Sequence, residues 1–84
     1  MKLNVKALAF AAALVWGAAM LLTGLGNLLW PGYGREFLRV MASVYPGYHA
    51  TSSLGQVIIG MLYGLADGAV GGAILAWLYN LFAA

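Results

Sequence analysis

Two long stretches of this chain are apolar and almost free of charge. No Asp, Glu, Lys or Arg falls within residues 7–34, and Asp67 alone interrupts the apolar run of residues 53–82. A helix needs about 20 mainly apolar residues to cross the hydrocarbon core of a bilayer. Both runs reach that length, and inside lipid each must be helical because its backbone polar groups have no other partners. We predict transmembrane helices over residues 7–30 and 53–82.

The composition excludes a water-soluble monomer. Charged residues make up 7% of the 84 residues and hydrophobic residues 64%, whereas a soluble domain carries about 25% charged residues. A chain this short buries only about 60% of its unfolded surface, so it cannot hide this much apolar surface from water. The chain has no cysteine, one histidine and two carboxylates. We therefore expect no enzymatic activity, no metal and no cofactor, and nothing indicates binding to nucleic acid.

The N-terminal run also has features of a secretory signal peptide. Lys2 and Lys6 precede the apolar segment, and Gly17-Ala18-Ala19 forms a small-residue stretch like those that signal peptidases cleave. The apolar run continues beyond these residues to Trp30. We therefore expect an uncleaved first helix.

The segment between the two runs predicts a short amphipathic helix over residues 34–45. Pro31-Gly32 ends the first transmembrane helix, and Pro46-Gly47 ends the connector helix. This helix is too short to span a membrane and is suited to the headgroup plane. On a helical wheel its apolar residues share one face and its polar residues the other: Phe37, Leu38, Val40, Met41, Val44 and Tyr45 against Arg35, Glu36, Arg39 and Ser43.

The predicted fold class is an all-α membrane protein: a hairpin of two transmembrane helices with a short interfacial helix in its connector. We expect a single membrane domain over residues 1–84. The second long helix should begin at Ser53, because Ser53-Leu54-Gly55-Gln56 has the S-x-x-Q pattern of a capping box.

Positive charges and aromatic residues suggest how the hairpin sits in a bilayer. Lys2 and Lys6 precede the first helix, which favours cytoplasmic termini in a multi-pass membrane protein. Arg35 and Arg39 are expected to meet lipid phosphates or the acidic surface of a partner. Three further aromatic residues are expected at the headgroup level: Trp30 at the connector end, and Trp77 and Tyr79 at the end with the termini.

The second long helix carries a regular spacing of glycines. Gly60, Gly64, Gly68 and Gly72 follow one another at four-residue intervals, and Ala76 extends the series. Small residues at this spacing let another helix backbone approach closely in a membrane. We predict tight helix packing on this face, with Gly71 beside it and Gly17 on the first helix.

Asp67 is the one charged residue expected near the middle of a membrane. Such a carboxylate is costly in lipid and marks a candidate functional site. Three roles remain open: a protonated hydrogen-bond donor between helices, a residue lining a polar pore, and a carrier of protons. In an antiparallel hairpin, Trp16 and Gly17 on the first helix lie at the same membrane depth as Asp67 on the second. Tyr63 lies one helical turn before Asp67. We expect Asp67 to bond Trp16, Tyr63 or a symmetry mate.

The sequence resembles a family of small bacterial membrane proteins commonly labelled bacteriophage holin. Four blocks carry the resemblance: Lys2-Leu3-Asn4-Val5-Lys6-Ala7-Leu8, Ser43-Val44-Tyr45-Pro46-Gly47-Tyr48, residues 63–72, and Ala76-Trp77-Leu78-Tyr79-Asn80-Leu81-Phe82. The resemblance covers nearly the whole chain and implies a two-helix membrane protein of bacterial origin.

Two functions remain open from the sequence. In the first, the hairpin assembles with copies of itself through its glycine face into a holin-like oligomer or pore. In the second, the same face packs against the helices of a larger membrane complex, and the chain is an accessory subunit. The expected partners are therefore membrane lipid and either the chain itself or a foreign membrane protein.

Overall fold

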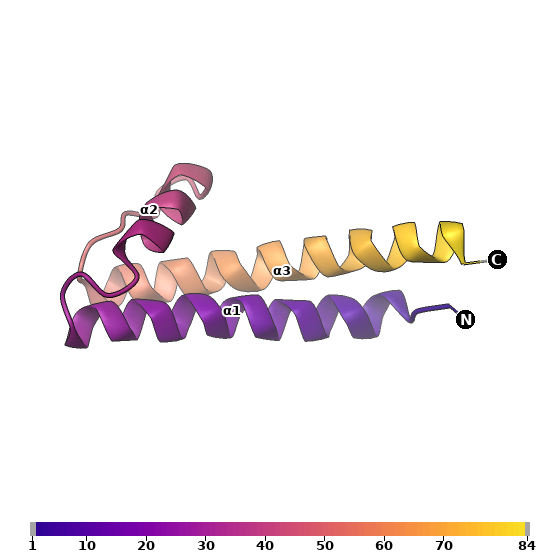
Figure 1. The fold of residues 1–84 in the computed structure, drawn as a ribbon, viewed down its shortest axis with the longest axis horizontal. Helices are drawn as coiled ribbons and strands as arrows, with labels where there is room; N and C mark the ends of the chain where they lie inside the picture. The colour runs from indigo at the N-terminus through magenta and orange to yellow at the C-terminus, as the bar shows by residue number, and fades with distance from the viewer. Residues whose placement is uncertain (1, 84) are drawn as a thin grey trace.

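The computed structural model describes residues 2–83 and is a helical hairpin with a third, shorter helix laid against it (Figure 1). Helix α1 spans Val5–Leu29, α2 spans Arg35–Val44 and α3 spans Leu54–Phe82. The two long helices run antiparallel, so both chain ends lie at the same end of the hairpin. No strand occurs among residues 2–83, and the predicted all-α hairpin with a short connector helix is confirmed.

Both long helices have the length and composition needed to cross a membrane. They contain 25 and 29 residues, and a rise of about 1.5 Å per residue makes each longer than the roughly 30 Å of a hydrocarbon core. Helix α1 begins two residues before the predicted start, because the Asn4 side chain caps it by accepting the Ala7 N–H at 2.9 Å. The predicted domain also includes Met1 and Ala84, which lie outside the described residues.

Glycine lets α1 and α3 approach one another closely. A Cβ atom added at Gly64 would lie 3.2 Å from the Gly17 Cα and 3.1 Å from the Trp16 carbonyl oxygen. A Cβ at Gly68 would lie 2.8 Å from the Ala13 Cα. These neighbours are backbone atoms, which cannot rotate away as a side chain can. A larger residue at either position would therefore force the two helices apart.

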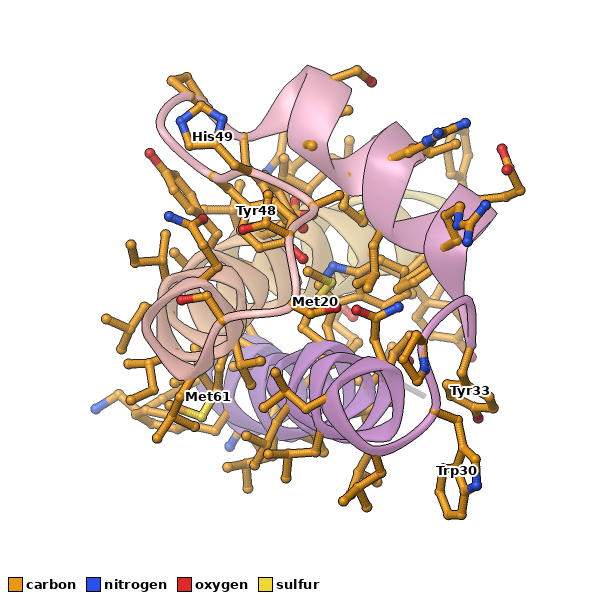
Figure 2. The ribbon with its side chains drawn as sticks, turned by 90° about the vertical axis from the view of Figure 1, so that its left-hand side faces the viewer. Met20, Trp30, Tyr33, Tyr48, His49 and Met61 are labelled. Atoms are coloured by element: carbon orange, nitrogen blue, oxygen red, sulfur yellow. The ribbon has the colours of Figure 1, made fainter. Side chains whose placement is uncertain are left out.

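Helix α2 folds back from the connector end along one side of the hairpin (Figure 1). Its apolar side and the loop after it cover a small core made of Met20, Leu38, Tyr45 and Tyr48, each at most 5% exposed. Figure 2, viewed along the hairpin, shows Met20 and Tyr48 in the space that the three helices enclose. Val40 and Val44, expected on the same apolar face, are instead exposed, because α2 turns only part of that face toward the hairpin.

The connector is fixed at both ends by a buried amide. The Asn27 side chain, 8% exposed, donates from Nδ2 to the Tyr33 carbonyl at 2.9 Å and accepts at Oδ1 from the Ser52 hydroxyl at 2.8 Å. Ser53 is the N-cap of α3, as the capping-box pattern predicts. Gln56, however, accepts the His49 N–H at 2.7 Å, and within the described residues Ser53 makes no side-chain cap bond. Gln56 thus ties the loop to α3.

Candidate functional site at Asp67

A chain of two hydrogen bonds joins all three helices near the middle of the hairpin. The indole N–H of Trp16 on α1 donates to the Tyr45 hydroxyl at 2.8 Å. That hydroxyl in turn donates to the Asp67 carboxylate on α3 at 2.7 Å. Tyr45 is the residue that directly follows α2. We call this arrangement the Trp16–Tyr45–Asp67 relay.

The backbone around Tyr45 holds its side chain in place. Its N–H bonds the Met41 carbonyl at 2.9 Å and closes the last turn of α2, and its carbonyl accepts the Tyr48 N–H at 3.1 Å. Gly47 permits the tight turn that follows, with φ at +81°. The turn leads the chain back to α3 and leaves the Tyr45 ring against the hairpin.

Two other tyrosines pack around Tyr45. The Tyr63 ring stacks on the Tyr45 ring, with centroids 4.9 Å apart and planes 5° from parallel. The Tyr63 hydroxyl donates to the Pro46 carbonyl. Tyr48 meets the Tyr45 ring edge-on at 6.3 Å. These contacts hold the end of α2 on α3 one turn before Asp67.

Burial keeps the Tyr45 hydroxyl protonated. Desolvation is the largest effect and raises the pKa of Tyr45; the bond from Trp16 lowers it, and the bond to Asp67 and the charge of Asp67 raise it further. Burial also raises the pKa of Tyr48. Tyr45 therefore remains a neutral donor toward Asp67 at physiological pH.

The donor to Asp67 differs from the one expected from the sequence. Neither Trp16 nor Tyr63 bonds the carboxylate directly among the described residues: Trp16 reaches it through Tyr45, and Tyr63 bonds Pro46. The expectation rests on residues of the two long helices at equal depth. The connector is absent from that comparison, yet α2 folds back and brings Tyr45, the observed donor, to Asp67. Tyr45 carried a usable signal, because a tyrosine on the apolar face of a helix needs a partner for its hydroxyl.

The glycine series lies against other parts of the same chain. Gly64, Gly68 and Gly72 face α1, while Gly60 faces Tyr48 and Met20. Ala76, which extends the series, is fully buried. The face that the sequence analysis assigned to assembly with another molecule is therefore occupied within the hairpin.

Gly17 belongs to the same contact, and Gly71 does not. A Cβ at Gly17 would meet the Leu65 side chain on α3. Gly71 is exposed, and a Cβ added there would have no neighbour within 4 Å. The sequence analysis predicts Gly71 among the packing glycines, but the helical turn points it away from α1.

A groove opens between α1 and α3 beside the relay. Its volume is about 320 Å³, and both Trp16 and Asp67 line it. The Asp67 side chain is exposed on this side of α3. The remaining lining residues are small or apolar: Ala12, Val15, Gly68, Gly71, Gly72 and Leu75.

The residues expected at the membrane surface are exposed. Trp30 lies at the connector end and points away from the three helices (Figure 2). Trp77 and Tyr79 are exposed near the end of α3. Arg35 and Arg39 lie on the exposed side of α2, where Arg39 is 3.6 Å from Glu36. These positions leave both arginines free to contact other molecules.

The described residues, 2–83, contain no group of three His, Cys, Asp or Glu side chains that could hold a metal ion.

A scan against protein-family models and searches of curated proteins and of solved structures found no match to this chain.

Proposed function

We propose that this chain is an accessory subunit of a membrane protein complex, embedded in the bacterial inner membrane and without enzymatic activity. The observation that carries this proposal is the open groove at Asp67, which remains free while the glycine face is filled by the chain's own α1. A hairpin that has satisfied its main packing face internally still offers a neighbour the groove, which carries an exposed carboxylate near the middle of α3.

The exposed apolar surface supports a location in the membrane. Large apolar side chains are exposed along both long helices, among them Phe10, Leu14, Leu22, Leu62, Val70, Ile74 and Leu75. Exposing such a surface to water costs about 25 cal/mol per Å², whereas lipid solvates it without that cost. The two helices also have the length that spanning requires.

A holin-like oligomer is the second candidate function. The observation that favours it is the same carboxylate, because a ring of hairpins that turned Asp67 inward would form a pore with a polar lining. Such a ring would have to assemble through the exposed apolar sides of α1 and α3 that flank the groove, since Gly64, Gly68 and Gly72 already contact α1.

Native mass spectrometry after purification in mild detergent separates the two functions. A foreign membrane protein in fixed stoichiometry with this chain supports the accessory subunit. A series of oligomers made of this chain alone supports the holin-like assembly and contradicts the first proposal. As an independent check, cells that express the chain are treated with an energy poison. Loss of the membrane potential beyond that in poisoned cells without the chain supports the pore, and a potential equal to theirs argues against it.

A further inference from the structure

We infer that the groove beside Asp67 binds a transmembrane helix of another protein, and that this helix carries a lysine or arginine at the depth of Asp67. The inference rests on the proposed function as an accessory subunit, because it specifies the chemistry of the partner. Three features of the hairpin support it: the unmet bonding capacity of the carboxylate, the positions of the chain's own cations, and the shape of the groove.

Asp67 is only partly satisfied within the chain. A carboxylate can accept about four hydrogen bonds, and among residues 2–83 only the Tyr45 hydroxyl donates one to Asp67. The ion pair that the described residues form is between Arg39 and Glu36, on the exposed side of α2. Charged side chains in lipid pair with one another or face a polar cavity. We therefore expect the exposed Asp67 carboxylate to pair with a cation from another molecule.

A second copy of this chain cannot supply that cation in the same orientation. Lys6 lies ten residues before Trp16 on α1, which is about 15 Å along the helix axis. Arg35 and Arg39 lie on the exposed side of α2, ten and six residues before Tyr45. A parallel copy would carry its own cations at these same depths, away from Asp67. Charge complementarity therefore favours a foreign helix.

The groove has the shape that such a helix needs. Half of its lining residues are small, and the exposed Gly71 leaves open space one turn beyond Asp67. Val15 and Leu75 add larger apolar side chains to the lining. The groove begins where α2 stops covering the hairpin, because Trp16 and Asp67 belong both to the relay and to the groove lining. On this side of the hairpin, α2 covers the half toward the connector, and the half toward the termini is open.

A synthetic helix tests the inference directly. The probe is a Leu/Ala-rich transmembrane peptide of about 24 residues with one central lysine, and its control has leucine at that position. The full chain, labelled at a cysteine introduced by Ala83→Cys, is reconstituted with each labelled peptide in vesicles of phosphatidylcholine and phosphatidylglycerol. The chain has no other cysteine, so labelling is specific. We expect energy transfer to report binding of the lysine peptide about tenfold tighter than that of the control.

Three variants locate the binding. Asp67→Asn keeps the size of the side chain and should abolish the preference for lysine. Gly71→Leu should fill the groove and weaken binding of the lysine peptide. The matched variant Ala18→Leu adds the same side chain on the exposed outer side of α1, outside the groove, and should leave binding unchanged.

Distinct results would overturn the inference. Equal binding of the two peptides, or a lysine preference that survives in Asp67→Asn, would exclude charge pairing at Asp67. Energy transfer between copies of the chain that depends on Asp67 would identify a second copy as the occupant instead. Alkaline extraction of the same vesicles separates the two proposals. Release of the chain would contradict both the membrane function and the inference, whereas a retained chain without lysine preference would contradict the inference alone.

Discussion

The Tyr45 hydroxyl donates a hydrogen bond of 2.7 Å to the Asp67 carboxylate. Tyr45 directly follows α2 and Asp67 lies on α3, and a turn, a loop and half of α3 separate the two residues. Their bond fixes the end of α2 at Asp67, which is the one charged residue in the central parts of α1 and α3. The bond to Asp67 therefore contributes to holding α2 against the hairpin.

Removing the Tyr45 hydroxyl should loosen α2. Tyr45→Phe keeps the ring and its stacking on Tyr63 but leaves the Trp16 N–H and the Asp67 carboxylate without their shared partner. A hydrogen bond to a charged group contributes about 1.5–3 kcal/mol. Because each 1.4 kcal/mol is about a tenfold change in an equilibrium, we expect the amides of α2 to exchange hydrogen at least about tenfold faster. Hydrogen exchange with mass spectrometry in detergent measures this. Tyr79→Phe removes an exposed hydroxyl and should have no effect; equal changes in both variants would contradict the role of the relay.

Adding one methyl group should distinguish two neighbouring glycines. Gly68→Ala places a Cβ 2.8 Å from the Ala13 Cα, so α1 and α3 must separate, at a cost of about 1–3 kcal/mol. Gly71→Ala meets no atom within 4 Å and should be neutral or stabilising by up to about 1 kcal/mol, because alanine favours helix over glycine. Unfolding in mixed micelles with increasing dodecyl sulfate measures both. Similar losses of stability in the two variants would be inconsistent with the observed packing.

Alkaline pH should release the connector helix. Burial and the neighbouring Asp67 raise the pKa of Tyr45 above its ordinary value of 10.0. In the unfolded chain the hydroxyl loses its proton near that value, whereas in the folded chain it keeps its proton to higher pH. The stabilisation from Tyr45 is therefore complete below about pH 10 and is lost as the pH rises through the folded pKa. Absorbance of tyrosinate checks this: Tyr45→Phe should remove a late-titrating component, and an unchanged titration curve would refute it.

Cysteine labelling should report the orientation of the hairpin. Because the native chain has no cysteine, Thr51→Cys and Ala83→Cys each introduce a single thiol, one in the exposed loop at the connector end and one after α3. With cytoplasmic termini, a membrane-impermeant maleimide should label Thr51→Cys in cells with a permeabilised outer membrane. Ala83→Cys should react only after the inner membrane is opened. The reverse pattern would place the termini on the other side.

Local signals in the sequence predict the helices. These signals are the long apolar runs, the prolines at positions 31 and 46 and the S-x-x-Q pattern, and the observed bounds of α1, α2 and α3 lie within two residues of the predicted ones. Asp67 could also be selected from the sequence, because a lone carboxylate in an apolar run is costly wherever the helix packs.

Which surfaces meet depends on how the three helices pack. Four glycines at regular spacing define a face on which a helix can pack, but the spacing is the same whether the neighbouring helix belongs to the same chain or to another. The fold places α1 on that face and leaves Gly71 and the Asp67 groove open. The donor to Asp67 was likewise undetermined, since a flexible connector permits many positions for Tyr45. The packing of α2 on Met20 and Tyr48 selects the one in which the hydroxyl reaches the carboxylate.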